Sequence, residues 1–137
     1  MTKEFDMEEV RKCILSFYYK AKGMTRTARH SYLQSKICVI AHRFGLIGDM
    51  EYPCKYVTPK GELRQGYIDV VWLDNNNNVV AAIEIDSSIR PKSYIKLNTV
   101  KASNKIWLYY GKKDDKFEKA NSIYNSNNSI EVIRPNK

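Results

Sequence analysis

Long hydrophobic runs are missing from this chain of 137 residues. No uninterrupted apolar segment approaches the roughly 20 residues that a helix needs to cross a membrane. The first six residues mix both signs of charge and lack the apolar core of a secretory signal. These absences argue against a membrane partner and lead us to expect a soluble, cytoplasmic protein.

Cysteine is also scarce, and its three residues form no metal-binding or disulfide pattern. Cys13, Cys38 and Cys54 are widely spaced, odd in number and free of any CxxC or Cys/His motif. Neither a disulfide framework nor a structural zinc site is therefore expected. We interpret all three as buried, reduced thiols of a cytosolic protein.

Acidic residues are outnumbered by basic ones. The chain has 23 Lys and Arg against 15 Asp and Glu, which gives a formal net charge of +8. An excess of this sign on a short chain favours a polyanionic partner, and nucleic acid is the first candidate. The alternative is that a composition rich in Lys and Asn reflects codon bias alone.

Two amphipathic helices are expected near the N-terminus. Apolar residues recur at spacings of three and four over about 6–22 and again over about 27–44, and Gly23 and Gly45 supply the stop signals. The length suits one ordinary domain, so residues 1–137 are treated as a single domain whose first part, 1–45, is helical.

The pattern changes to that of strands after residue 46. Strands are predicted at 50–57, 67–73, 79–85 and 105–110, with a crossover helix at about 91–103. Pro53 restricts the first strand to an edge or a bulge. Residues 46–111 should form the core of an α/β (α+β) fold with a mixed four-stranded sheet. Residues 112–137, with a short helix near 114–122 and a possible edge strand at 130–133, are expected to be a small C-terminal appendage.

Two carboxylates lie inside apolar strands of this predicted sheet. Asp69 is flanked by Ile68 and Val70, and Glu84 is flanked by Ile83 and Ile85. An ionised carboxylate in such a setting is costly unless it is paired, protonated or bound to a metal. If the strands are neighbours, both carboxylates and the carbonyl oxygen of Ile85 can hold one Mg²⁺ or Mn²⁺ ion. The structural alternative is that Asp69 caps a loop or pairs with Arg64.

The two strands resemble the PD-(D/E)XK, or restriction-endonuclease-like, superfamily of nucleases. The resemblance rests on GYIDVVW at 66–72 followed by AAIEID at 81–86, and it covers roughly residues 30–110. It is greatest toward the CoiA-like competence nucleases and the small Vsr-related domains. It implies a restriction-endonuclease-like core that hydrolyses phosphodiester bonds of DNA, or less readily RNA, with Mg²⁺ held by Asp69 and Glu84.

One position departs from the superfamily pattern, because Asp86 stands where the superfamily has its lysine. Some relatives carry the basic group on the following helix, where this chain has Lys92 and Lys96 four residues apart. We favour Lys96, since it is closer to the face that packs on the sheet. Asp86 or Glu51 would complete the site, and Gln34 occupies the other place where relatives carry an acid. The alternative reading treats the two lysines as solvated helix charges.

Cations and aromatic residues alternate around the turn between the first two helices. This pattern can bind a phosphate backbone and stack bases, and Lys92 is added to the same group. The residues concerned are Lys20, Lys22, Arg26 and Arg29, with Tyr18, Tyr19 and Tyr32. The alternative is a solvated connector beside core tyrosines. His30 and His42, twelve residues apart, form no ligand pair and are interpreted as structural residues or phosphate contacts.

Two functions follow from these patterns. The first is a metal-dependent nuclease that acts on DNA. The second is an inactive nuclease-like fold that binds nucleic acid or inhibits a nucleic-acid-processing machine, in which case a protein partner is expected. A homodimer is compatible with either function.

Overall fold

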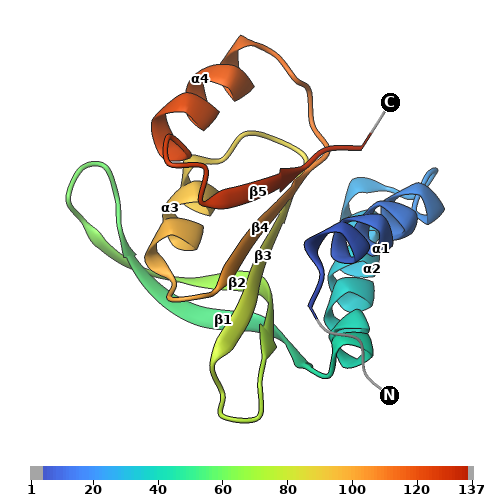
Figure 1. Cartoon of the computed structure of the whole chain (residues 1–137). Coiled ribbons are helices and arrows are strands. Elements are labelled where there is room, and N and C mark those ends of the chain that lie inside the picture. Colours follow the sequence, from blue (N-terminus) through green and yellow to red (C-terminus); the bar gives the residue numbers. More distant parts are fainter. Residues whose placement is uncertain (1–4, 136–137) are drawn as a thin grey trace.

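A single five-stranded mixed sheet forms the centre of the fold, with helices on both of its faces (Figure 1). The computed structural model describes residues 5–135. The elements in chain order are α1 (Met7–Lys20), α2 (Arg26–Ile40), the 3₁₀ turn η1 (Ala41–Phe44), β1 (Ile47–Val57), β2 (Leu63–Leu73), β3 (Val79–Asp86), α3 (Pro91–Thr99), β4 (Asn104–Tyr109), α4 (Asp115–Tyr124) and β5 (Ile130–Ile133).

The two N-terminal helices begin and end at residues that the sequence marks. The Asp6 side chain accepts a hydrogen bond from the Glu8 amide, and Thr25 does the same for Ala28. Gly45 adopts a left-handed φ of 73°, which glycine tolerates at low cost, and it ends the helical segment. Both helices were predicted. The last turn of the second differs, because residues 41–44 form a 3₁₀ turn.

The strand order is β1-β2-β3-β4-β5. The first three strands pair antiparallel, and β3 pairs parallel with β4 after the crossover through α3, as the sequence predicted. Pro53 lies in β1 at the edge of the sheet, where its missing N–H removes no ladder bond. The β3 residues from Ala81 to Ile85 are all buried, so this strand is covered on both faces.

The expected four-stranded sheet with a C-terminal appendage is wrong. Residues 130–133 form β5, which pairs parallel with β4 and brings Leu108 opposite Ile133. Ile133 has no exposed surface and belongs to the core beneath α1 and α2. The possible edge strand predicted at 130–133 is confirmed as β5, but so short an apolar run gives too weak a local signal to identify its distant partner strand.

Each face of the sheet has its own apolar core. On one face α1 and α2 pack over β-strand residues that include Trp72, Ile83 and Ile85, and the indole N–H of Trp72 donates to the Ile37 carbonyl at 2.9 Å. On the other face α3 and α4 pack over an aromatic cluster centred on Trp107. Within residues 5–135, none of the helices is both long and apolar enough to span a membrane.

Strands β2 and β3 separate at the level of Asp69. Their pairing ends at Val70 opposite Ile83, whereas β1 and β2 remain paired as far as Val57 opposite Leu63. Residues 52–68 therefore leave the sheet as a two-stranded ribbon, called the arm below, which projects on the left of Figure 1. Glu51, with a left-handed φ of 54°, lies where the arm begins.

Candidate active site

The carboxylates of Asp69 and Glu84 lie side by side where β2 and β3 part. The Asp69 amide donates to Glu84 Oε2 at 2.8 Å, and the Ile85 amide donates to Asp69 Oδ2 at 2.8 Å. Each strand thus supplies a carboxylate that accepts a backbone N–H of the other strand. The two side chains replace ladder hydrogen bonds that would otherwise be lost at the point of separation. We call this reciprocal pair of contacts the carboxylate clip.

Lys96 of α3 reaches the clip from the aromatic side of the sheet. Its Nζ lies 2.6 Å from Glu84 Oε1 and donates to the Tyr67 carbonyl at 2.6 Å. The side chains of Lys96 and Glu84 are 9% and 2% exposed, so this ion pair is buried. The sequence favoured Lys96 over Lys92, and the structure places Lys96 in direct contact with a carboxylate of the site.

Burial dominates the electrostatics of Glu84. It raises the pKa of Glu84 to about 7, with a further contribution from the neighbouring Asp69 charge, while Lys96 acts in the opposite direction. Burial also works to lower the pKa of Lys96, but Glu84 outweighs it, and the lysine pKa is raised. Lys96 therefore stays charged at neutral pH, whereas Glu84, with its pKa of about 7, changes its protonation state in that pH range.

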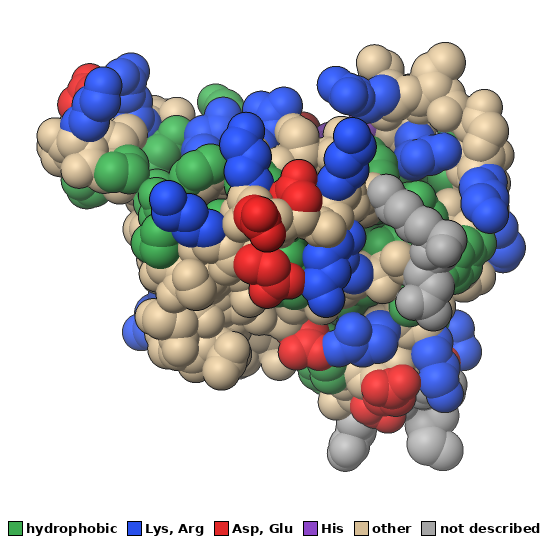
Figure 2. Space-filling model, turned by 90° about the horizontal axis from the view of Figure 1, so that it is seen from above, with side chains coloured by type: hydrophobic (Ala, Val, Ile, Leu, Met, Phe, Trp, Pro, Cys, Tyr) green, Lys and Arg blue, Asp and Glu red, His purple; other side chains and the backbone are tan. Residues whose placement is uncertain are grey.

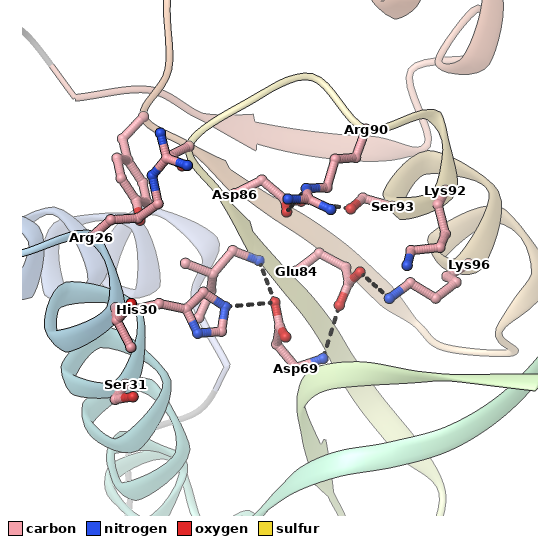
Figure 3. Close-up of a pocket in the computed structure, with 14 residues that line it drawn as sticks. Arg26, His30, Ser31, Asp69, Glu84, Asp86, Arg90, Lys92, Ser93 and Lys96 are labelled. Carbon is pink, nitrogen blue, oxygen red and sulfur yellow. Dashed lines mark hydrogen bonds and ion pairs between the residues drawn. The ribbon is translucent and has the colours of Figure 1, made fainter.

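His30 approaches Asp69 from α2, opposite to Lys96 (Figure 3). Its Nε2 lies 3.6 Å from Asp69 Oδ2, and this contact raises the pKa of His30 although burial opposes it. The sequence interpretation missed this proximity. His30 and Gln34 are four residues apart on one face of α2, and the Gln34 side chain donates to the Asp69 carbonyl at 2.9 Å. The four-residue spacing of His30 and Gln34 was the feature of the sequence that pointed to a shared helix face.

Glu51 and Asp86 lie next to the clip, where each has hydrogen-bond partners of its own, and Asp86 lines the same pocket as Asp69 and Glu84. Glu51 is exposed, and its Oε1 accepts a hydrogen bond from Gln34 rather than joining the clip. Asp86 Oδ2 accepts from the Ser93 hydroxyl at 2.5 Å and the Trp107 indole at 2.8 Å, and Arg90 lies 3.6 Å from Oδ1. Asp86 thus links β3 to the start of α3, and it directly follows Ile85, whose amide belongs to the clip.

The clip forms one wall of a pocket of about 390 Å³. Basic side chains from α2 and from the start of α3 also line the pocket (Figure 3). The carboxylates are called its acidic floor below, and the basic side chains its cationic rim. The lining includes the three rim cations Arg26, Arg90 and Lys92, the clip and its neighbours His30 and Lys96, and the hydroxyl-bearing residues Thr27, Ser31, Ser87, Ser93 and Tyr110.

The other basic residues selected from the sequence lie away from this pocket. Arg29 packs its guanidinium over the rings of Tyr18 and Tyr110 and donates to the Ala21 carbonyl at 3.3 Å, which gives it a structural role. Lys20 lines a separate pocket beside α1, and Lys22 is exposed in the turn. Arg64 pairs with Glu62 at 2.9 Å instead of with Asp69.

The donor set suits a hard divalent cation. Carboxylate oxygens of Asp69 and Glu84 and the adjacent Ile85 carbonyl are the ligand types that Mg²⁺ and Mn²⁺ prefer. Two neighbouring carboxylates, one of them buried, also gain electrostatically from a bound positive charge. Within residues 5–135 no cluster of three or more His, Cys, Asp or Glu side chains is arranged as a metal site.

Comparison of the chain with protein-family models, curated proteins and solved structures found no significant match. The family resemblance therefore rests on the sequence motif alone.

The titrating groups predict how stability depends on pH in the absence of metal. Both Glu84 and His30 have a folded-state pKa above the ordinary value, so proton binding favours the folded state. Their stabilisation is complete below the ordinary pKa values of 4.5 and 6.5, and is lost as pH rises through about 7 for Glu84 and through the raised pKa for His30. The Glu84 contribution amounts to about 3 kcal/mol at most.

Urea unfolding in EDTA at about pH 6 and about pH 8 measures this effect. The unmodified chain should lose more stability between the two pH values than Glu84→Gln does, with Glu118→Gln on the surface of α4 as the matched control. Equal pH dependence of all three proteins would contradict a raised Glu84 pKa.

Proposed function

We propose that the chain is a metal-dependent nuclease of the restriction-endonuclease-like type that hydrolyses phosphodiester bonds in DNA. The observation that supports this most directly is the carboxylate clip with Lys96 of the crossover helix 2.6 Å from Glu84. It unites an Asp from one strand, a Glu from the next and a lysine, which are the three side-chain types that the PD-(D/E)XK resemblance implies.

The residues divide the chemistry between them. Asp69, Glu84 and the Ile85 carbonyl would hold Mg²⁺ or Mn²⁺, and the cation would supply Lewis acidity for phosphodiester hydrolysis. Lys96 keeps its charge in a buried setting, where an ammonium group counters negative charge more effectively than it does in bulk water. The superfamily carries its lysine on the strand, at the position that Asp86 occupies here. We infer that Lys96 of α3 takes over the role of that lysine.

The rim cations position the substrate. Arg26, Arg90 and Lys92 line the same pocket as the clip, from two separate elements. Guanidinium groups suit bidentate contacts with phosphate, and lysine adds a point charge. A phosphodiester backbone is the polyanion that fits a cationic rim around an acidic floor, and the net charge of +8 favours its approach.

A cleavage assay tests the proposal. Purified protein is incubated with duplex DNA, single-stranded DNA and RNA in Mg²⁺, in Mn²⁺ and in EDTA, and calorimetry with Mn²⁺ alone measures cation binding. We expect cleavage of DNA that requires the cation, and one cation site that depends on Glu84. Intact substrates under every condition would overturn the nuclease proposal.

A second candidate function is an inactive nuclease-like fold that binds nucleic acid or inhibits a nucleic-acid machine. It is favoured by the contacts of Glu84, because one carboxylate oxygen already accepts the Asp69 amide and the other already pairs with Lys96. Under this reading the ion pair replaces the metal permanently. Duplex binding without a calorimetric Mn²⁺ site would identify it.

A further inference from the structure

The arm presents a face that nothing covers within the described residues. Residues directly opposite each other share a face, and Tyr52, Cys54 and Ile68 face the core beneath α3. The alternate residues form the outer face, and all six are exposed. They are the pairs Pro53 and Tyr67, Lys55 and Gln65, and Val57 and Leu63.

The outer face is continuous with the candidate active site. Tyr67 precedes Asp69 by two residues on β2, and its carbonyl holds Lys96 in place. We propose that the outer face of the arm binds a nucleic acid duplex in its major groove, so that the pocket meets the adjoining backbone. This inference rests on the proposed function of the same site and adds that the substrate is double-stranded.

The chemistry of the outer face suits base edges. A two-stranded β-ribbon is one of the two protein elements that the major groove admits. Lys55 can donate to guanine O6 and N7, and Gln65 can pair with adenine. Val57 and Leu63, which are 55% and 69% exposed, offer apolar contacts for thymine methyl groups. Tyr67, 49% exposed, supplies a further amphipathic surface next to the pocket.

Charge also favours a nucleic acid on this surface. The arm carries Lys55 on its outer face and Lys60 near its tip, whereas Arg64 lies on the other face and is paired with Glu62 at 2.9 Å. In the space-filling view, Lys and Arg side chains extend along one edge of the molecule from the protruding arm toward the N-terminal helices (Figure 2). The cationic rim of the pocket includes Arg26 of α2 and Arg90 and Lys92 at the start of α3, so one polyanion can contact the arm and the rim together.

A second copy of the chain suits the arm less well. Pro53 removes a donor from the open edge of β1, and the left-handed Glu51 interrupts its regular hydrogen-bonding groups. Two arms brought together would also place like charges side by side. These features protect the edge from β-pairing and leave the outer face for a partner of opposite charge.

Binding to a short fluorescent DNA duplex in EDTA tests the inference without cleavage. The arm variant is Lys55→Ala with Leu63→Ser, and the matched control is Lys119→Ala with Ile123→Ser on α4, where both side chains are also exposed. We expect the arm variant to weaken duplex binding about tenfold with an unchanged melting temperature, and the control to bind like the unmodified chain. Affinity for a single strand of the same length should change much less.

The possible results distinguish the role of the arm in duplex binding from the nuclease activity of the candidate site. Equal duplex binding by the two double variants, or no duplex binding by the unmodified chain, overturns the inference. So does a loss confined to single strands, or a dimer that becomes a monomer in the arm variant. If the unmodified chain still cleaves DNA in these cases, the proposed function stands. Arm-dependent duplex binding by a chain that cleaves nothing would retain the inference and overturn the nuclease.

Discussion

Asp69→Asn is expected to lower metal-dependent DNA cleavage by roughly a thousandfold or more and to remove the cation site. The substitution keeps the shape of the side chain, and its amide oxygen can still accept the Ile85 N–H. It removes the charge that a cation requires. The folded structure should therefore persist while cleavage and Mn²⁺ binding are lost together.

The cleavage assay and Mn²⁺ calorimetry measure both effects. Asp115→Asn in the exposed first turn of α4 is the matched control, and it should retain full activity. Cleavage by Asp69→Asn at the rate of the unmodified chain would remove Asp69 from the proposed site and would trace the activity to another group or to a contaminant.

Lys96→Met is expected to cause a larger loss of stability than any other single substitution in the candidate site. It leaves the Glu84 carboxylate buried without its counter-charge, and the Tyr67 carbonyl without its donor. Breaking such a pair costs about 3 kcal/mol of unfolding free energy at about pH 8, where Glu84 is ionised. The cost should fall at about pH 6, because Glu84 can then take up a proton.

Urea unfolding of three variants measures this cost. Lys92→Met, one helical turn earlier and exposed, should change stability by no more than about 0.5 kcal/mol. The double variant Lys96→Met with Glu84→Gln should recover at least half of the loss, because both charges are gone. A Lys96→Met protein as stable as Lys92→Met would mean that the ion pair contributes nothing.

The contact with Glu84 also changes what Lys96 does for the cation. From the sequence alone, the lysine should only orient water or phosphate, so that its loss would leave metal binding intact. Since Lys96 occupies Glu84 Oε1 and repels a second positive charge there, its removal should strengthen cation binding near neutral pH. Cleavage should be lost in either case.

The sequence predicted the strands and their carboxylates because these follow local patterns. Runs of β-branched, aromatic and apolar residues placed Asp69 and Glu84 in strands, and the short turn between the strands made them neighbours. His30 was not identified, because its approach to Asp69 depends on how α2 crosses the sheet. The sequence predicted 130–133 as a possible edge strand, and the structure confirms it as β5. Its parallel partner and the separation of β2 from β3 were not predicted, because both are set by tertiary contacts.

The carboxylate clip fixes the rotamers of its two acids before any ligand arrives. Backbone amides of the sheet restrain Asp69 and Glu84, and Lys96 restrains Glu84 from a third direction. The loss of their rotational freedom thus belongs to the folding of the sheet and not to binding. A ligand that enters the pocket meets a rigid, preorganised set of oxygen atoms whose spacing is set by the separation of two strands.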